Sequence, residues 1–275
     1  MKIEGFIASL ALLSSSALAL EEHVTDSVIA KQRATLAEYI KDKGYGPQSP
    51  RDIDDLNGEN NLKFGIAPAY THMNLCNIHF HKNAEHKGGE FTTYAGNGDG
   101  KGYYTGYVYN GSLTQDELSP FESEGSELQS GDTIEVHYVH STANVKPAPT
   151  LGACLSESLA NPQLRVETQV FVLVNDANAL DFVRLTEYAQ KDGYYQAINI
   201  LNNTGTPVEY AGSTTGSSYN EIASPLQVTW SVRPRVAKLN IASVDKWLQS
   251  NDFDEDHAHS VRNLITNPEL LSSGH

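Results

Sequence analysis

Residues 165–174 read Arg-Val-Glu-Thr-Gln-Val-Phe-Val-Leu-Val (RVETQVFVLV), a run rich in β-branched side chains. Such runs are typical of strands that are buried within a sheet, so we expect a central strand here. Outward from it, further strands are predicted at residues 74–81, 133–140 and 226–232, with shorter pieces around 103–109. Apolar residues at near-helical spacing predict one helix within residues 23–43. The chain is therefore predicted to be mainly β.

The composition is that of a folded, acidic protein. Hydrophobic residues make up 39% and charged residues 19% of the 275 residues, which is typical of globular rather than disordered chains. The formal net charge of −15 at pH 7 repels nucleic acid and anionic membrane surfaces, so neither is expected as a partner. No repeat and no clear linker divides the chain, which predicts a single domain over residues 20–275.

The first 19 residues are predicted to be a cleaved signal peptide. Lys2 supplies a positive charge, residues 6–13 form a short apolar stretch, and residues 17–19 (Ala-Leu-Ala) have the form of a signal-peptidase site. A membrane anchor is the alternative, but the apolar stretch is far shorter than the roughly 20 residues that span a bilayer. We see no later segment long and apolar enough to do so. A periplasmic or secreted location is therefore expected.

Export would place the chain in an oxidising compartment. Its two cysteines, Cys76 and Cys154, are then expected to form one disulfide, with two buried free thiols as the alternative. Two cysteines cannot by themselves form a thiolate zinc site.

Two of the ten histidines flank a phenylalanine in a predicted strand. Because side chains alternate between the faces of a strand, His79 and His81 point the same way and Phe80 points the other way. This pairing predicts part of a metal site, although two solvent-facing residues of an edge strand would have the same spacing.

A third ligand has to come from elsewhere, because catalytic zinc takes three protein ligands and keeps one position open. The candidates are His86, His137 and His140. Residues 137 and 140 face opposite sides of their strand, and His137 is the one that shares a face with Glu135 and Val139. We therefore predict His79, His81 and His137 as the ligands.

Two polar residues are placed to orient these histidines. Metal-bound imidazoles need an acceptor for their second ring N–H. Asn77 precedes His79 by two residues and Glu135 precedes His137 by two, so each lies on the ligand face of its strand. A carboxylate inside a sheet core is otherwise costly, which favours a role for Glu135 beside the metal.

Six segments in this order resemble carbonic anhydrases. They are residues 48–53 (QSPRDI), 77–86 (NIHFHKNAEH), 135–140 (EVHYVH), 210–215 (YAGSTT), 228–230 (VTW) and 259–263 (HSVRN). The motifs are those of the alpha class, but a long insertion separates Glu85 from Glu135. With this altered spacing, residues 79–89 (HFHKNAEHKGG) look most like the delta class.

The resemblance implies a fold and an activity. The fold would be a single domain with a large, twisted, mostly antiparallel central sheet and short peripheral helices, as in alpha carbonic anhydrases. The activity would be reversible hydration of CO2 to bicarbonate by zinc-hydroxide attack, with Zn2+ as cofactor and a small molecule as the partner. An oligomer is possible but not predicted. The alternative is a carbonic-anhydrase-like periplasmic zinc-binding protein without hydratase activity.

The resemblance also implies supporting roles around the metal. Glu85 is expected to accept a hydrogen bond from a threonine that orients the attacking group. That threonine is Thr215 by ungapped comparison, or Thr214 if one residue is deleted. Val139 and Trp230 are expected to form an apolar wall for CO2, although plain core packing would use them equally well.

The proton-transfer residue is the least defined of the expected groups. His72 precedes His79 by seven residues, an odd number, so on one continuous strand it would face away from the metal. It can act as the shuttle only if the chain bends between the two. His257 and His259 lie in or next to an acidic run and are expected to be part of a solvated tail.

Overall fold

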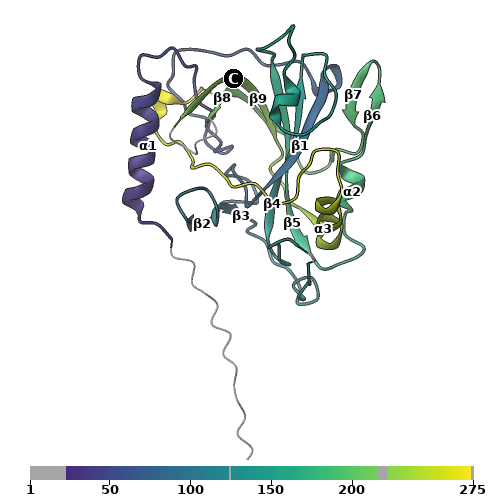
Figure 1. The fold of residues 1–275 in the computed structure, drawn as a ribbon. Coiled ribbons are helices and arrows are strands. Elements are labelled where there is room, and N and C mark those ends of the chain that lie inside the picture. The colour runs from purple at the N-terminus through teal and green to yellow at the C-terminus, as the bar shows by residue number, and fades with distance from the viewer. Residues whose placement is uncertain (1–22, 124, 216–221, 274–275) are drawn as a thin grey trace, which may run out of the picture.

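A six-stranded sheet organises the molecule (Figure 1). The computed structural model describes residues 23–123, 125–215 and 222–273, except for the side chains of residues 214, 215 and 225. The strand order is β1-β4-β5-β9-β8, and β10 also pairs with β5. The strands are β1 (Asn74–Lys82), β4 (Thr133–Ser141), β5 (Leu164–Val174), β8 (Val208–Thr215), β9 (Ala223–Val232) and β10 (Ala237–Asn240).

The pairing of the strands confirms a mainly β fold with a mostly antiparallel sheet. The pairs β1–β4, β4–β5 and β8–β9 are antiparallel, whereas β5–β9 and β5–β10 are parallel. Strand β5 is buried at every position and has β4 on one side and β9 and β10 on the other. The run at residues 165–174 is therefore a central strand, as its β-branched composition predicted.

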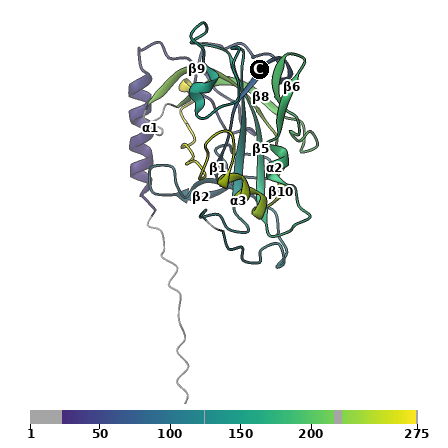
Figure 2. The ribbon, with the colours of Figure 1, turned by 45° about the vertical axis from the view of Figure 1, so that its right-hand side comes forward.

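The helices are few and lie at the periphery. The predicted helix is α1 (Asp26–Ile40), which packs Leu36 and Ile40 against Ala223 of β9. Two shorter helices, α2 (Phe182–Leu185) and α3 (Ile241–Gln249), lie on the other side of the molecule from α1 in both views (Figures 1 and 2). None of the helices in the described ranges combines the length and the apolar character that a bilayer crossing requires.

The two faces of the sheet carry different cores. On one face, Phe80 of β1 contacts Phe182 of α2 and Trp247 of α3, with ring centroids 5.7 and 6.0 Å apart. On the other face, Val139, Val166 and Trp230 belong to a second cluster. Because strand side chains alternate, the residues next to Phe80 in the sequence, the two predicted ligands, project from this second face.

Several elements were not anticipated from the sequence. Strand β8, the hairpin of β6 (Tyr188–Lys191) and β7 (Tyr194–Ala197), the short strand β10 and helix α3 are all absent from the predicted pattern. In β8, Gly212 weakens the side-chain alternation from which a strand is predicted. A Cβ there would lie 2.8 Å from the backbone nitrogen of Ser49, so only glycine lets residues 48–49 approach this edge of the sheet.

The remaining elements are short. A small antiparallel pair is formed by β2 (Thr93–Asn97) and β3 (Thr105–Val108), and single 3-10 turns occur at η1 (Tyr70–His72), η2 (Leu151–Cys154) and η3 (Pro268–Leu270). The predicted disulfide is present: Cys76 of β1 is bonded to Cys154 at the end of η2, with Cα atoms 5.1 Å apart. It ties the loop between β4 and β5 to the strand that carries two of the histidines.

Candidate metal centre

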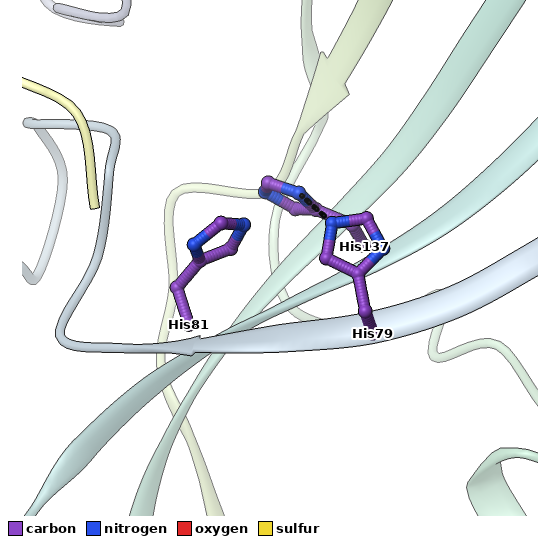
Figure 3. Close-up of side chains that lie close together, drawn as sticks. All are labelled: His79, His81 and His137. Atoms are coloured by element: carbon purple, nitrogen blue, oxygen red, sulfur yellow. Dashed lines mark hydrogen bonds between the residues drawn. The ribbon is translucent and has the colours of Figure 1, made fainter. Parts of the chain in front are cut away.

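Three histidines from two neighbouring strands converge on one point. His79 pairs directly with His137 in the antiparallel register of β1 and β4, and His81 follows two residues along the same face. One ligand nitrogen of each ring lies within 4.8 Å of the others. Figure 3 shows the rings of His79 and His81 rising from the same side of β1, with the ring of His137 facing them. All three side chains are buried, so this group could hold a metal ion.

On β1, the outer ring nitrogens are already engaged. His79 Nδ1 lies 2.7 Å from Asn77 Oδ1, and His81 Nδ1 lies 2.7 Å from the carbonyl oxygen of Ser260. Both partners accept hydrogen bonds, so each ring carries its proton on Nδ1. The Nε2 atoms of both rings are therefore left with bare lone pairs, which are what a metal ion binds.

On β4, the same arrangement is reached through the opposite ring nitrogen. His137 Nε2 donates to Glu135 Oε1 at 2.6 Å, which leaves Nδ1 bare and 3.3 Å from His79 Nε2. His140, three residues on, faces the other way and packs its ring 5.3 Å from that of Tyr70. The alternation of β4 thus separates the two candidate histidines as the sequence indicated.

Glu135 is the centre of a buried hydrogen-bond network. Its carboxylate accepts from His137 and also from the ring (2.7 Å) and the backbone N–H (3.0 Å) of His86. His86 Nε2 in turn lies 2.6 Å from the hydroxyl of Tyr210. Burial acts to raise the pKa of Glu135, but His86 and His137 outweigh it and hold the pKa well below its usual value. The carboxylate is therefore ionised although it is fully buried.

Burial keeps the two ligand imidazoles of β1, His79 and His81, neutral. It lowers the pKa of His79 well below its usual value, and neighbouring His137 and His81 add to this effect. Burial likewise lowers the pKa of His81 to about 3. Neutral imidazole is the form that coordinates a metal, so the protonation state that the fold imposes is the one a metal site needs.

The segment 259–262 completes the centre from far along the chain. His259 extends the edge of β1, since its N–H donates to the carbonyl of Phe80 at 2.8 Å and its carbonyl accepts from Lys82 N–H at 3.1 Å. The next residue, Ser260, supplies the acceptor for His81. The contact between His81 and the Ser260 carbonyl could not be predicted, because an isolated extended segment that pairs only through its backbone has no characteristic sequence pattern.

The expectation of a solvated tail holds only in part for His259, whose side chain is 41% exposed but whose backbone pairs with β1. Its ring centroid lies 5.1 Å from that of His79 and 5.7 Å from that of His81, and its Nε2 lies 2.5 Å from Glu255 Oε2. Pairing with the edge of β1 pulls this part of the acidic segment onto the metal centre. His257 remains exposed, as expected.

Glu85 forms a buried charge cluster with two arginines. Its Oε1 accepts the backbone N–H of Arg262 at 2.9 Å and lies 3.5 Å from Arg51 Nη1 and 3.6 Å from Arg262 Nη1. Burial acts to raise its pKa, but His81, Arg262 and Arg51 lower the pKa to about 2. Within the described residues, Oε2 of this buried carboxylate has no hydrogen-bond partner.

A cavity of about 220 Å³ opens onto the three histidines. Apolar side chains form most of its lining, which also includes Glu85 and Arg262. The lining residues are His79, His81, Glu85, His137, Val139, Leu151, Leu164, Val166, Ser224, Leu226, Val228, Trp230 and Arg262. The cavity thus brings the predicted ligands together with Val139 and Trp230.

Of the other two predicted catalytic residues, Thr215 and His72, only His72 has a described side chain. The backbone of Thr215 pairs with Ala223, next to Ser224 of the cavity lining, but the side chains of Thr214 and Thr215 lie outside the described part of the structure. His72 ends η1, is exposed, and is not among the described residues that line the cavity. The structure therefore does not bring His72 to the histidine cluster.

The comparison with protein families gives one match. A family model described as delta carbonic anhydrase matches residues 70–243. Among solved structures, the chain is similar to the alpha-carbonic anhydrase of Photobacterium profundum, with 16% identity over 81% of this chain and 88% of that chain and a TM-score of 0.28. No curated protein sequence matches the chain.

Proposed function

This chain belongs to the delta carbonic anhydrase family, and we propose that it is a zinc-dependent carbonic anhydrase that interconverts CO2 and bicarbonate. The convergence of His79, His81 and His137 at the floor of a mostly apolar cavity is the observation that carries this proposal. The metal would be reached from the cavity, where a small neutral gas can enter.

The donor set fits zinc. Three neutral imidazole nitrogens and one position left for solvent are the usual ligand set of a catalytic zinc ion. Zinc held in this way lowers the pKa of bound water to about 7 and so supplies a nucleophile near neutral pH. Asn77, the Ser260 carbonyl and Glu135 hold the three rings in the tautomers that leave metal-facing lone pairs bare.

The apolar lining has a role in substrate binding. Val139 shares a face of β4 with His137, and Trp230 lies on the neighbouring part of the lining. These groups offer CO2 no competing hydrogen bonds and limit the number of water molecules beside the histidines. We propose that they form the surface on which CO2 rests before it reacts.

Glu85 is proposed to orient the attacking group through Thr215. The support is Oε2 of Glu85, which has no hydrogen-bond partner among the described residues, and the pairing of the Thr215 backbone with Ala223, the neighbour of Ser224 in the cavity lining. Thr215→Val is expected to lower kcat/KM about 10²-fold, the scale of a lost orientation, with a smaller loss for Thr214→Val. Stopped-flow hydration rates of the two variants check this assignment, and a larger loss from Thr214→Val would transfer the role to that residue.

We further propose that residues 1–19 are a cleaved signal peptide, that residues 20–275 form the catalytic domain, and that the enzyme is periplasmic or secreted. The Cys76–Cys154 disulfide supports an extracytoplasmic location, because such bonds persist in oxidising compartments. Mass spectrometry of the mature protein checks the cleavage; an N-terminus at Met1 in the exported protein would contradict it.

Removing zinc tests the function directly. Purified protein loaded with one equivalent of zinc is expected to hydrate CO2 in a stopped-flow assay, to lose this activity on chelation and to regain it when zinc is returned. Thermal melting before and after chelation controls for unfolding. A zinc-loaded, folded protein that does not hydrate CO2 would contradict the proposal and leave a zinc-binding protein without hydratase activity.

A further inference from the structure

The cavity over the histidines has two chemically different sides. One side is formed by apolar residues of β4, β5 and β9, among them Val139, Val166 and Trp230. The other side carries Glu85 and Arg262, the charged residues of its lining other than the histidines. Such asymmetry suits a site that handles both a neutral and a charged molecule.

Behind the polar side of the cavity, two arginines share one carboxylate. The single carboxylate of Glu85 is shared by Arg51 and Arg262, whose Nη1 atoms lie 3.5 and 3.6 Å from Oε1. Arg51 is fully enclosed, and its Nη2 donates to the carbonyl of Asn263. One positive charge of the two therefore has no carboxylate of its own in this cluster.

Arg262 is the guanidinium that remains available. It is the one lysine or arginine among the described residues that line this cavity; its side chain is 24% exposed, against 2% for Arg51, and also lines a second cavity with Asp26 and Tyr94. Its Nε is buried and finds no acceptor among the described residues. Because Nε is buried, a ligand can reach Arg262 only at the terminal nitrogens of its partly exposed guanidinium.

We propose that Arg262 binds the anionic partner of the reaction, bicarbonate, beside the metal position; this rests on the proposed carbonic anhydrase activity. The planar guanidinium presents parallel N–H donors that match two oxygens of a planar carboxylate-like anion. CO2 is neutral and offers no such charge. Arg262 therefore distinguishes bicarbonate from CO2 within one cavity.

The backbone of the segment 259–262 is what delivers Arg262 to the cavity. Its pairing with the edge of β1 at His259, and the bond from Arg262 N–H to Glu85, fix the start of the side chain. This segment lies outside the part of the chain, 70–243, that the family model matches. The anion contact thus depends on how the C-terminal segment pairs with β1.

Bicarbonate binding to the zinc-loaded protein tests the proposal. We would measure it by isothermal titration calorimetry, at a pH where bicarbonate predominates, for the wild type, Arg262→Gln, Arg262→Lys and Arg184→Gln. The last variant removes the same charge from an exposed position on α2. Arg262→Gln is expected to weaken binding at least about tenfold, the value of a hydrogen bond to a charged group. Arg262→Lys keeps the charge without the paired donors and should lose only part of the affinity.

Equal bicarbonate affinity in wild type and a folded, zinc-loaded Arg262→Gln variant would overturn the proposal, as would an equal loss from Arg184→Gln. If the glutamine variant does not fold, Arg262→Lys decides: affinity equal to the wild type overturns the role of the paired donors. Stopped-flow hydration by the wild type is measured in parallel. An inactive wild type whose anion binding still depends on Arg262 would refute the activity and leave the anion site in place.

Discussion

His137→Ala is expected to abolish zinc binding and CO2 hydration together. Zinc would keep two of its three protein ligands, and the buried carboxylate of Glu135 would lose one of its donors. Loss of a group that only orients a ligand costs about 10–100-fold in metal affinity or activity, so loss of a ligand itself should exceed this range. Zinc content after dialysis and the stopped-flow rate measure the two effects separately.

An exposed histidine provides the matched control. His23→Ala makes the same chemical change outside the cavity lining, and zinc content and hydration should stay at wild-type levels. Circular dichroism of both variants shows whether the fold is kept. A His137→Ala protein that is folded, retains stoichiometric zinc and hydrates CO2 normally would remove His137 from the ligand set.

Loss of the disulfide is expected to destabilise the whole fold. The double variant Cys76→Ala/Cys154→Ala opens a link between residues 78 positions apart, and it leaves neither a free thiol nor a new polar group in the core. Removal of such a bond typically lowers the free energy of unfolding by about 2–5 kcal/mol. Urea denaturation of the two proteins measures this difference.

The same substitution should loosen one edge of the metal cavity. Cys154 ends η2, whose first residue, Leu151, is part of the cavity lining, and Cys76 lies three residues before His79.

Reductant provides the control for the stability measurement, since it should bring the wild type toward the stability of the double variant and leave the variant unchanged. Unfolding free energies within about 0.5 kcal/mol of each other would mean that the disulfide is not a major source of stability.

The spacing of residues along single strands predicted most of the site. The alternation of strand side chains alone put His79 and His81 on one face and separated His137 from His140, and the structure has both arrangements. The same rule placed Asn77 and Glu135 beside the rings that they contact. The β-branched run at 165–174 likewise identified the central strand, because burial on both faces leaves a compositional trace.

Strands without such a characteristic composition were not predicted from the sequence. The glycine in β8, the short length of β10 and the four-residue strands β6 and β7 each weaken the alternation on which strand prediction depends. Their place in the fold is decided by partners distant in the sequence. Strand β10, for example, pairs in parallel with the second half of β5.

The sequence by itself thus determined that His79 and His81 share a face and that His137 and His140 do not, since residues on one strand are related by local geometry. Only the tertiary structure decided what surrounds them. The Ser260 carbonyl, the ring of His259 and the guanidinium of Arg262 reach the site because the backbone of residues 259–262 pairs with the edge of β1. Backbone hydrogen bonds are the same for every residue type, so such pairing leaves no pattern in the side chains that a single sequence could reveal.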